Sequence, residues 1–564
     1  PQRYKNYFIR YLTMESARTF LWLTFVALCM FLFIEWNDQS RRAAIETKPE
    51  PSSIQAPDEN VYDAQFSSES FQENLPSIST NSNIDTLAAV SRKSETISLS
   101  NNVLSISVDT KGADIVAAKL LKYYPSKNDQ DNKIDLMYMN DTISDFHRLQ
   151  SGLLSTGGEN SPTHIENYSL ASKGRNKLTF VWATDTLRTT KTLTLNPDSY
   201  LVKVSFNIEN MTDDQMSFIP YYQLVKDNVE FERSMFDVES YSYDGGIIFD
   251  GDSYEKQYAD DLIEEPYKKT HTNGWFANIR HHFVVAVLPA FGVEHRFEAE
   301  HDQAVNLNKL TAISNSAITV GPKQKTETGF EIFIGPKLQN ELTKAREGLE
   351  VSVDYGMLSF LAKPMFWALN KSHSFLGNWG LAIIFVTLMI KAIFYRLQES
   401  SSRSMAKMRE LAPRLKALNE RYKDDRTALG QAQMELYKRE KVNPMAGCLP
   451  LLIQIPFFIA FYWVLLESVE IRQAPFYFWL DDLSSRDPYF VLPLIMGVVM
   501  FFQQKANPAP ADPIQEKVFM FMPVMFTLLF AWFPSGLVLY WVTNSLLQFA
   551  QQWNVNRKMA AEKN

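Results

Sequence analysis

Long apolar runs in the last third of the chain constrain its fold more than any other feature. The run from Phe375 to Tyr395 is long enough to cross a bilayer as a helix, yet it contains Lys391. A lysine near the middle of such a helix costs roughly 2.5–3.5 kcal/mol on insertion scales. The amine must either snorkel to the membrane surface or face a hydrated cavity inside the bilayer. The residues of this run alone leave both interpretations open.

Averages over the whole chain conceal a division between two unlike parts. Residues up to about 350 are mostly polar and those beyond about 355 mostly apolar, so the net charge of -8 says little about partners. Both cysteines, Cys29 and Cys448, lie in apolar runs. The polar part therefore has no disulfide, and we expect packing alone to stabilise its core.

The N-terminal region predicts a membrane anchor and a tether. Within residues 1–36, the apolar run Phe20 to Trp36 follows several arginines and lysines, which predicts a cytoplasmic N-terminus. No small-residue cleavage site follows the run, so an uncleaved signal-anchor helix is favoured over a signal peptide. Met14 resembles a natural start, which would make the residues before it an extension. Residues 37–94 are rich in Ser, Asn, Glu, Gln and Pro and predict a disordered periplasmic tether.

Region 95–350 alternates between apolar and polar residues with a period of two. Leu104, Ile106 and Val108 alternate with serines, and similar runs recur between turn residues such as Asp250-Gly251. Many short strands with regular turns predict one large, antiparallel, all-β sandwich in the periplasm. The pair His281-His282 falls within a predicted strand, so we expect ordinary strand residues there rather than a site.

Region 351–375 carries apolar residues at helical spacing with polar residues between them. This pattern predicts an interfacial amphipathic helix along the membrane, bent at Pro364. A buried helix of a soluble domain would show the same spacing, but the adjoining apolar run favours the interface.

Region 376–564 predicts five further membrane spans, which with the first make six transmembrane α-helices with both termini in the cytoplasm. The predicted spans are 376–395, 445–466, 489–503, 517–533 and 535–553. The basic stretch 396–443 between the first two of these predicts a cytoplasmic helical hairpin. Its narrow apolar seam includes Met405, Met408, Leu411 and Tyr437, with a kink expected at Pro413.

Several polar residues lie inside the predicted spans. Thr387 is one helical turn before Lys391, Gln454 lies in the third span, and Asn544 and Ser545 lie in the last. They suit either a polar groove or hydrogen bonds between helices, and their spacing does not decide between the two. The chain has no nucleotide-binding glycine loop, metalloprotease helix or serine elbow. We therefore expect no enzyme activity, no metal and no cofactor.

Specific strings in the second half resemble a known family. They are NPMAGCLPLLIQIP at 443–456, HSFLGNWG at 373–380, SMAKM at 404–408, RQAPF at 472–476 and FPSGLVLYW at 533–541. These strings closely resemble the YidC membrane-protein insertases of the YidC/Oxa/Alb family. The large polar domain and the predicted hairpin resemble the Gram-negative type.

The resemblance implies a hydrophilic groove enclosed by the five C-terminal spans, open to the cytoplasm and to lipid. Lys391 stands where relatives usually carry an arginine, which keeps the charge but loses the bidentate fork. A substrate helix would slide into lipid along the third and fifth spans. The residues expected on this slide are Ile455, Phe458, Phe461, Phe519, Met522 and Met525.

The resemblance further implies partners and a location. The partners would be nascent membrane proteins, the Sec translocon with its accessory subunits, the ribosome and the lipid bilayer, without recognition of a nucleic-acid sequence. The location would be the bacterial inner membrane. The periplasmic domain also resembles sugar-processing β-sandwich folds, from which no sugar chemistry follows.

Two other classes of function remain possible from the residues. A solute transporter or channel could use the same intramembrane lysine, although we find no repeat between early and late spans. A membrane-anchored periplasmic enzyme acting on carbohydrate would instead depend on region 95–340.

Overall fold

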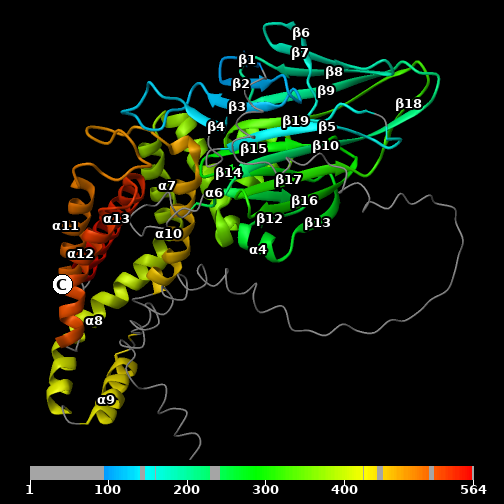
Figure 1. Cartoon of the computed structure of the whole chain (residues 1–564). Helices are drawn as coiled ribbons and strands as arrows, with labels where there is room; N and C mark the ends of the chain where they lie inside the picture. The colour runs from blue at the N-terminus through cyan, green and yellow to red at the C-terminus, as the bar shows by residue number, and fades with distance from the viewer. Residues whose placement is uncertain are drawn as a thin grey trace, which may run out of the picture.

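The computed structural model describes residues 95–561, with gaps at 140–145, 159, 229–241, 423–424, 441, 443–448 and 507–512. The predicted first membrane helix and the tether lie outside the described residues. A β-rich part, coloured blue to green in Figure 1, adjoins a helical part coloured yellow to red.

The first sheet has ten strands. Nine of them follow the order β1-β2-β3-β4-β5-β10-β17-β16-β13, and β18 pairs with β10. Its strands are β1 (Thr96–Ser100), β2 (Leu104–Asp109), β3 (Ile115–Leu120), β4 (Ile134–Met139), β5 (Phe146–Ser155), β10 (Met216–Asp227), β13 (Tyr267–Thr272), β16 (Glu294–Asp302), β17 (Leu307–Ser314) and β18 (Ile318–Val320).

The second sheet has nine strands in the order β12-β11-β14-β15-β19-β9-β8-β7-β6. Its strands are β6 (Ser169–Lys173), β7 (Lys177–Ala183), β8 (Leu187–Leu195), β9 (Leu201–Asn210), β11 (Gly245–Phe249), β12 (Tyr254–Gln257), β14 (Trp275–Arg280), β15 (Phe283–Leu288) and β19 (Lys325–Pro336). Alternate residues of β7, among them Leu178 and Phe180, are fully buried. The prediction of an all-β sandwich is confirmed.

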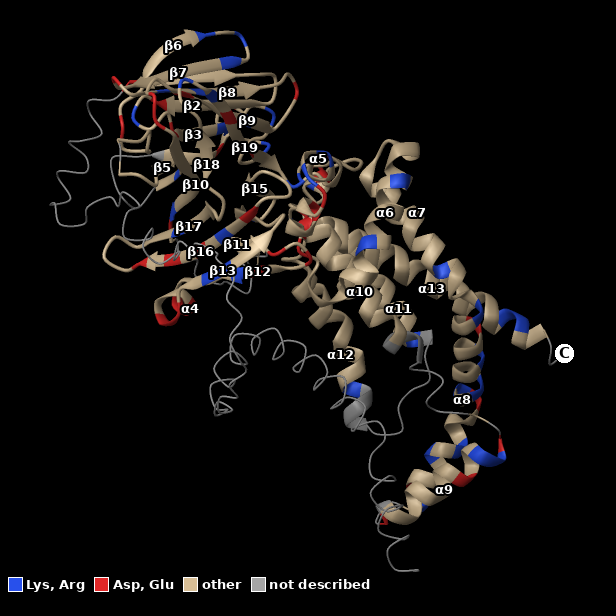
Figure 2. Cartoon of the chain, turned by 90° about the vertical axis from the view of Figure 1, so that its right-hand side faces the viewer, with Lys and Arg blue, Asp and Glu red and all other residues tan. Residues whose placement is uncertain are grey.

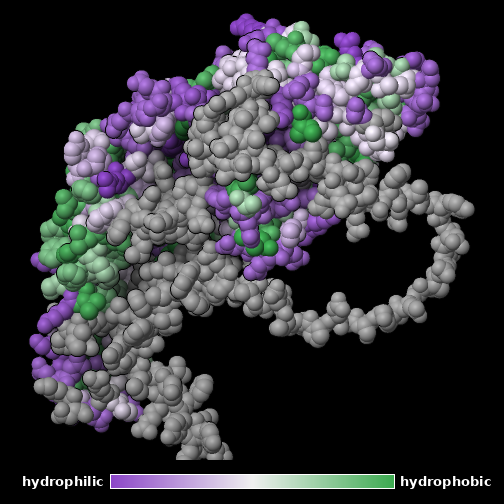
Figure 3. All heavy atoms as spheres, viewed as in Figure 1, coloured by the Kyte–Doolittle hydropathy of each residue, from purple (hydrophilic) through white to green (hydrophobic). Residues whose placement is uncertain are grey.

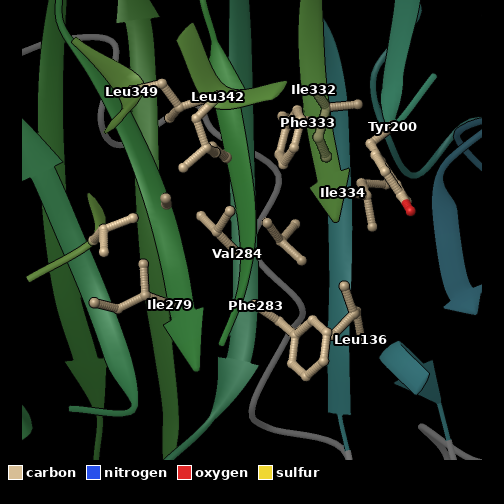
Figure 4. Packing of buried hydrophobic residues seen from close by; sticks show 14 of the residues in the cluster. Leu136, Tyr200, Ile279, Phe283, Val284, Ile332, Phe333, Ile334, Leu342 and Leu349 are labelled. Atoms are coloured by element: carbon tan, nitrogen blue, oxygen red, sulfur yellow. The ribbon is translucent and has the colours of Figure 1, made fainter. Parts of the chain in front are cut away.

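Residues from both sheets and from short helices meet in one core. Figure 4 shows Leu136 of β4 beside Phe283 of β15, with Ile334 of β19 nearby. Leu342 of α5 (Gln339–Ala345) and Leu349 of the 3-10 helix η4 (Leu349–Ser352) pack on the same cluster. A further short helix, α4 (Ala259–Glu264), contributes the buried Leu262.

The structure corrects the prediction for His281 and His282. They form the tight turn between β14 and β15 rather than part of a strand, and their rings stack with centroids 3.7 Å apart. His281 Nε2 lies 2.9 Å from the carbonyl oxygen of Leu466 in α10 (Leu449–Glu467). The histidine pair therefore belongs to the junction between the sandwich and the helices.

A buried ion pair lies at this junction. Lys337 Nζ, just after β19, lies 3.9 Å from Glu467 Oε2 at the end of α10, and both side chains are almost fully buried. Ser242 Oγ donates a hydrogen bond of 3.1 Å to Glu467 Oε1. Removal of either charge would leave the other buried without its partner, so we expect the sandwich and α10 to move as one unit.

Helix α6 (Ser359–Leu376) follows the short 3-10 helix η5 (Gly356–Leu358) and packs against α7 (Trp379–Ile393) and α10. It buries Ala362, Met365, Phe366 and Leu369 on one face and exposes Phe360, Trp367 and Phe375 on the other. It continues through Pro364 as one helix.

The remaining helices complete the helical part. They are α8 (Tyr395–Arg421), α9 (Arg426–Arg439), α11 (Val491–Ala506), α12 (Pro513–Phe530) and α13 (Ser535–Ala561), with a 3-10 turn η7 (Val469–Ile471). Figure 2 shows charged residues on the sandwich and on α8 and α9, whereas the helices between them are mostly uncharged. Hydrophobic side chains gather on the surface near α11 and α12 in Figure 3.

Within the described ranges, no helix meets the length and hydropathy expected of a membrane span by itself. Helices α7 and α8 meet these criteria only as a pair, bent by 69°. Shorter apolar stretches lie at Ile453–Glu467, Val491–Lys505 and Lys517–Phe530. The count of six transmembrane helices stays a prediction.

Helices α8 and α9 form a hairpin. Asp425 caps α9 by accepting hydrogen bonds of 3.0 Å from the amides of Thr427 and Ala428. Leu411, Leu415, Leu436 and Val442 are buried in the seam, with Met408, Leu418 and Tyr437 packed around them. Met405 is half-buried outside this cluster, and Pro413 is exposed within the continuous helix α8.

Candidate functional site

Lys391 lies in the last turn of α7, which a side-chain cap at Asn378 begins. Its Nζ atom is buried and has no hydrogen-bond partner among the described residues. The amine therefore does not snorkel to the protein surface. The carbonyl end of α7 offers it a modest favourable field, because the helix dipole is negative there.

The lysine lines a small cavity between four helices of the helical module. The space open to the centre of a water molecule is about 30 Å³, enough for one or two waters. The lining residues are Ile390, Lys391 and Phe394 at the end of α7, Leu397 and Gln398 on α8, Ile453, Gln454 and Phe457 on α10, and Tyr540 and Asn544 on α13.

Half of this lining is polar or charged, which distinguishes it from the surrounding helix contacts. Gln398, Gln454, Tyr540 and Asn544 bring donors and acceptors to the walls around Lys391. Among the described residues, no acidic side chain lines the cavity. Such a wall can hydrogen-bond water or a polar peptide segment, and the unpaired ammonium adds attraction for a carboxylate.

The structure brings together three of the five residues predicted for a polar groove, namely Lys391, Gln454 and Asn544. Thr387 instead donates its hydroxyl proton to the Ile383 carbonyl of its own helix at 2.7 Å. Ser545 is buried but does not line the cavity.

The sequence interpretation missed Gln398 and Tyr540. Gln398 lies beyond the end of the predicted span, on α8, which is bent by 69° from α7, so helical spacing from Lys391 does not place it. Tyr540 is one helical turn before Asn544 and could have been found by helical spacing.

Aromatic rings fill the space beside the cavity. The Tyr540 ring lies 4.6 Å from Phe461, and Phe458 lies 4.8 Å from Trp541. Phe461 is fully buried in this contact. Its ring packs inside the helix bundle, and its place on the substrate slide stays a prediction.

The other predicted slide residues lie on two helices and are more accessible. Ile455 and Phe458 on α10 and Phe519 and Met522 on α12 are half-buried, and Met525 on α12 is 48% exposed. Neighbouring apolar residues of α12, such as Phe521 and Leu528, are also exposed. These residues supply an apolar surface on α10 and α12.

Known proteins match both parts of the chain. The family described as "YidC periplasmic domain" matches residues 96–368, and the family described as "60Kd inner membrane protein" matches residues 371–563. A protein named membrane protein insertase YidC from Pseudomonas fluorescens is 37% identical, over 97% of this chain and 99% of its own. The chain belongs to the YidC family.

Two further comparisons describe the extent of the likeness. The YidC of Methylobacillus flagellatus is 39% identical over 96% of this chain and 97% of its own. A solved structure titled as an active YidC insertase with its first transmembrane domain resolved is 19% identical, covering 81% of this chain and 91% of that one. Its TM-score is 0.37.

Proposed function

We propose that this chain inserts proteins into the bacterial inner membrane and helps them fold, with the cavity at Lys391 as the entry site for hydrophilic segments. The buried, unpartnered amine of Lys391 among four polar side chains carries this proposal. Membership of a family whose curated relatives are named membrane protein insertases supports it.

The charge on Lys391 would act first. Two unit charges 4 Å apart attract by about 4 kcal/mol at the effective dielectric constant near a protein surface. An acidic segment entering the cavity would gain part of this energy and would exchange water for the amides of Gln398, Gln454 and Asn544. The cavity has room for only one or two waters, so a peptide would have to widen it.

The apolar surface of the substrate would act second. A membrane-spanning segment has about 20 apolar residues, and burial of each large side chain contributes about 1.5–3 kcal/mol. This sum exceeds the cost of moving a short polar tail. The segment would leave along Ile455 and Phe458 of α10 and Phe519, Met522 and Met525 of α12, where the flexible methionines suit varied sequences.

The proposal includes a membrane topology. Six transmembrane helices, at 1–36 and within 376–564, would leave both termini in the cytoplasm and the sandwich of 95–350 in the periplasm. Residues 351–375 would lie at the membrane surface. The hairpin of 396–443 would extend from the cytoplasmic side, where it could receive nascent chains from the ribosome, with the Sec translocon as a second partner. The basic residues of the hairpin support this orientation.

Substitution of Lys391 tests the proposal. Lys391→Ala and Lys391→Glu should both reduce insertion of a small single-span substrate with an acidic outer segment, and Glu should do so more strongly because it repels that segment. Lys371→Ala is the matched control, since Lys371 is exposed on α6. Undiminished insertion by both Lys391 variants would refute an essential charge.

Crosslinking tests the path. A photoreactive residue at Phe458 or Met525 should crosslink a stalled nascent chain, whereas one at the fully buried Ile383 should not. Equal crosslinking from all three positions would contradict the proposed exit surface.

A further inference from the structure

The loop between α10 and α11 ends in an exposed aromatic tip that the fold itself does not use. Phe478 is 93% exposed and Tyr477 is 48% exposed. Phe478 also has a φ of 62°, a left-handed conformation that is unfavourable for a bulky side chain. A large apolar residue that is both strained and exposed suggests a role outside the folded chain.

The exposure of Phe478 does not arise from a loose loop. The Phe476 amide donates a hydrogen bond of 2.8 Å to the Leu480 carbonyl, and the Leu483 amide donates one of 2.9 Å to the Ala474 carbonyl. Ala474, Leu480 and Leu483 are buried. These three residues belong to the main hydrophobic cluster, so the loop packs into the core while Phe478 stays outside it.

Contacts on either side fix the loop against the ends of the helices. Asn378 Nδ2, at the start of α7, donates to the Pro475 carbonyl at 3.2 Å. The Gly536 amide, at the start of α13, donates to the Leu483 carbonyl at 2.9 Å. Because these helices start where the loop lies, the aromatic tip is at the same end of the helical module as the sandwich (Figure 1, orange).

A second exposed ring lies just before Asn378, the residue that contacts the loop. Phe375, in the last turn of α6, is 89% exposed and lies three residues before Asn378. Helix α7 also exposes apolar side chains along its length, namely Phe385, Leu388 and Ile393, which are between 43% and 74% exposed. No charged residue occurs from Ala474 to Leu480.

We propose that Phe478, with Tyr477 and Phe375, inserts into the acyl chains of the outer lipid leaflet and anchors this end of the helical module. Lipid is the occupant because the tip is uncharged, because α7, whose start contacts the loop, exposes apolar side chains, and because aromatic rings favour the membrane interface. The inference does not depend on the role proposed for Lys391.

Nitroxide accessibility in proteoliposomes tests this anchor. The full chain, with Cys29 and Cys448 replaced by serine, would carry a spin label at Phe478→Cys. Leu170→Cys is the control, because Leu170 is 41% exposed on β6, which lies away from the helices in Figures 1 and 2. Oxygen concentrates in lipid, and a nickel chelate stays in water.

The label at 478 should collide with oxygen more often than the label at 170, and several-fold less often with the nickel chelate. Equal nickel accessibility at both positions would overturn the proposal by placing the tip in water. Protection from both reagents would also overturn it, because another protein would then cover the tip. A label at Phe375→Cys should repeat the lipid result and covers the case in which the loop variant fails to fold.

Discussion

Two buried lysines show how differently the sandwich and the helical module treat the same charge. Lys191 Nζ, on β8, lies 3.5 Å from Asp114 Oδ1 and donates to the carbonyls of Gly112 at 2.7 Å and Ser151 at 3.3 Å. Lys391 Nζ is also buried, but it has no such partner among the described residues. The sandwich satisfies its buried amine, whereas the helical module leaves one available.

This difference supports a structural role for Lys191 and the functional role proposed for Lys391. The amine of Lys191 crosses between the sheets, because Lys191 belongs to the nine-stranded sheet and Ser151 to the ten-stranded one. Its hydrogen bonds offset the cost of burial. The amine of Lys391 faces a cavity with room for water. The free-energy cost of burying this amine is therefore offset only when water or a ligand enters the cavity.

The largest expected effect comes from breaking the paired site. Lys191→Met should destabilise the sandwich by about 3–5 kcal/mol, because it leaves Asp114 buried without its partner. Hydrogen exchange of the β8 and β9 amides in the full chain would measure this loss. Lys177→Met, at an exposed position of β7, is the control. A loss equal to that of the control would show that the Lys191 pair contributes nothing.

Removal of a buried ring should come next. Phe461→Ala should cost about 3 kcal/mol, near the lower end for such substitutions, because the neighbouring Tyr540 ring has room to relax. The thermal unfolding midpoint of the helical module should fall accordingly. Met525→Ala should change it little because Met525 is half exposed. A larger effect at Met525 would contradict the assignment of Phe461 to the core.

The paired site should also respond to pH. Burial raises the pKa of Asp114 from 3.8 to about 6, although Lys191 and Arg148 oppose the shift. The folded state therefore takes up this proton before the unfolded state as pH falls. Between pH 7 and pH 4 the carboxyl should stabilise folding by about 2 kcal/mol, and this contribution should disappear as pH rises through 6.

The pH effect must be measured as a difference between the parent chain and Asp114→Asn. Burial lowers the pKa of His164 to about 3, so its neutral ring stabilises the folded state near neutral pH. This stabilisation is lost as pH falls, which opposes the effect of Asp114. Urea unfolding at pH 7 and pH 4 would give the difference. A parent and variant with parallel pH profiles would contradict the raised pKa of Asp114.

The smallest effect on stability should occur at the unpaired lysine. Lys391→Met should leave the fold unchanged or stabilise it by about 1–2 kcal/mol, because an unsatisfied buried polar group is removed. Insertion should nevertheless fall. Thermal unfolding and an insertion assay on the same preparation would compare the two responses. Strong destabilisation would mean that Lys391 has a structural partner after all.

The alternation of apolar residues was enough to predict the sandwich, because one face of each strand must be buried. It could not reveal that His281 and His282 turn the chain, since a two-residue turn leaves the flanking pattern intact. The spacing of Thr387 and Lys391 correctly placed them on one helix. It could not reveal that Thr387 bonds its own backbone, because hydroxyl orientation depends on local geometry.

The slide residues show a similar limit. Phe458 and Phe461 are one turn apart and equally apolar, so the sequence gives them the same role. Phe461 is fully buried and Phe458 only half-buried, although both rings lie beside Tyr540 of α13, at centroid distances of 4.6 Å and 6.3 Å. Such contacts between distant helices follow from packing angles that a single sequence does not specify.

Water access to position 391 is the most direct test of the central claim. In a chain with Cys29 and Cys448 replaced by serine, Lys391→Cys in sealed vesicles would be treated with a charged, membrane-impermeant thiol reagent. Cytoplasmic-side reagent should modify it, whereas Ile383→Cys, eight residues earlier and fully buried, should stay unreactive. An unreactive position 391 would show a dry cavity and contradict the role proposed for its lysine.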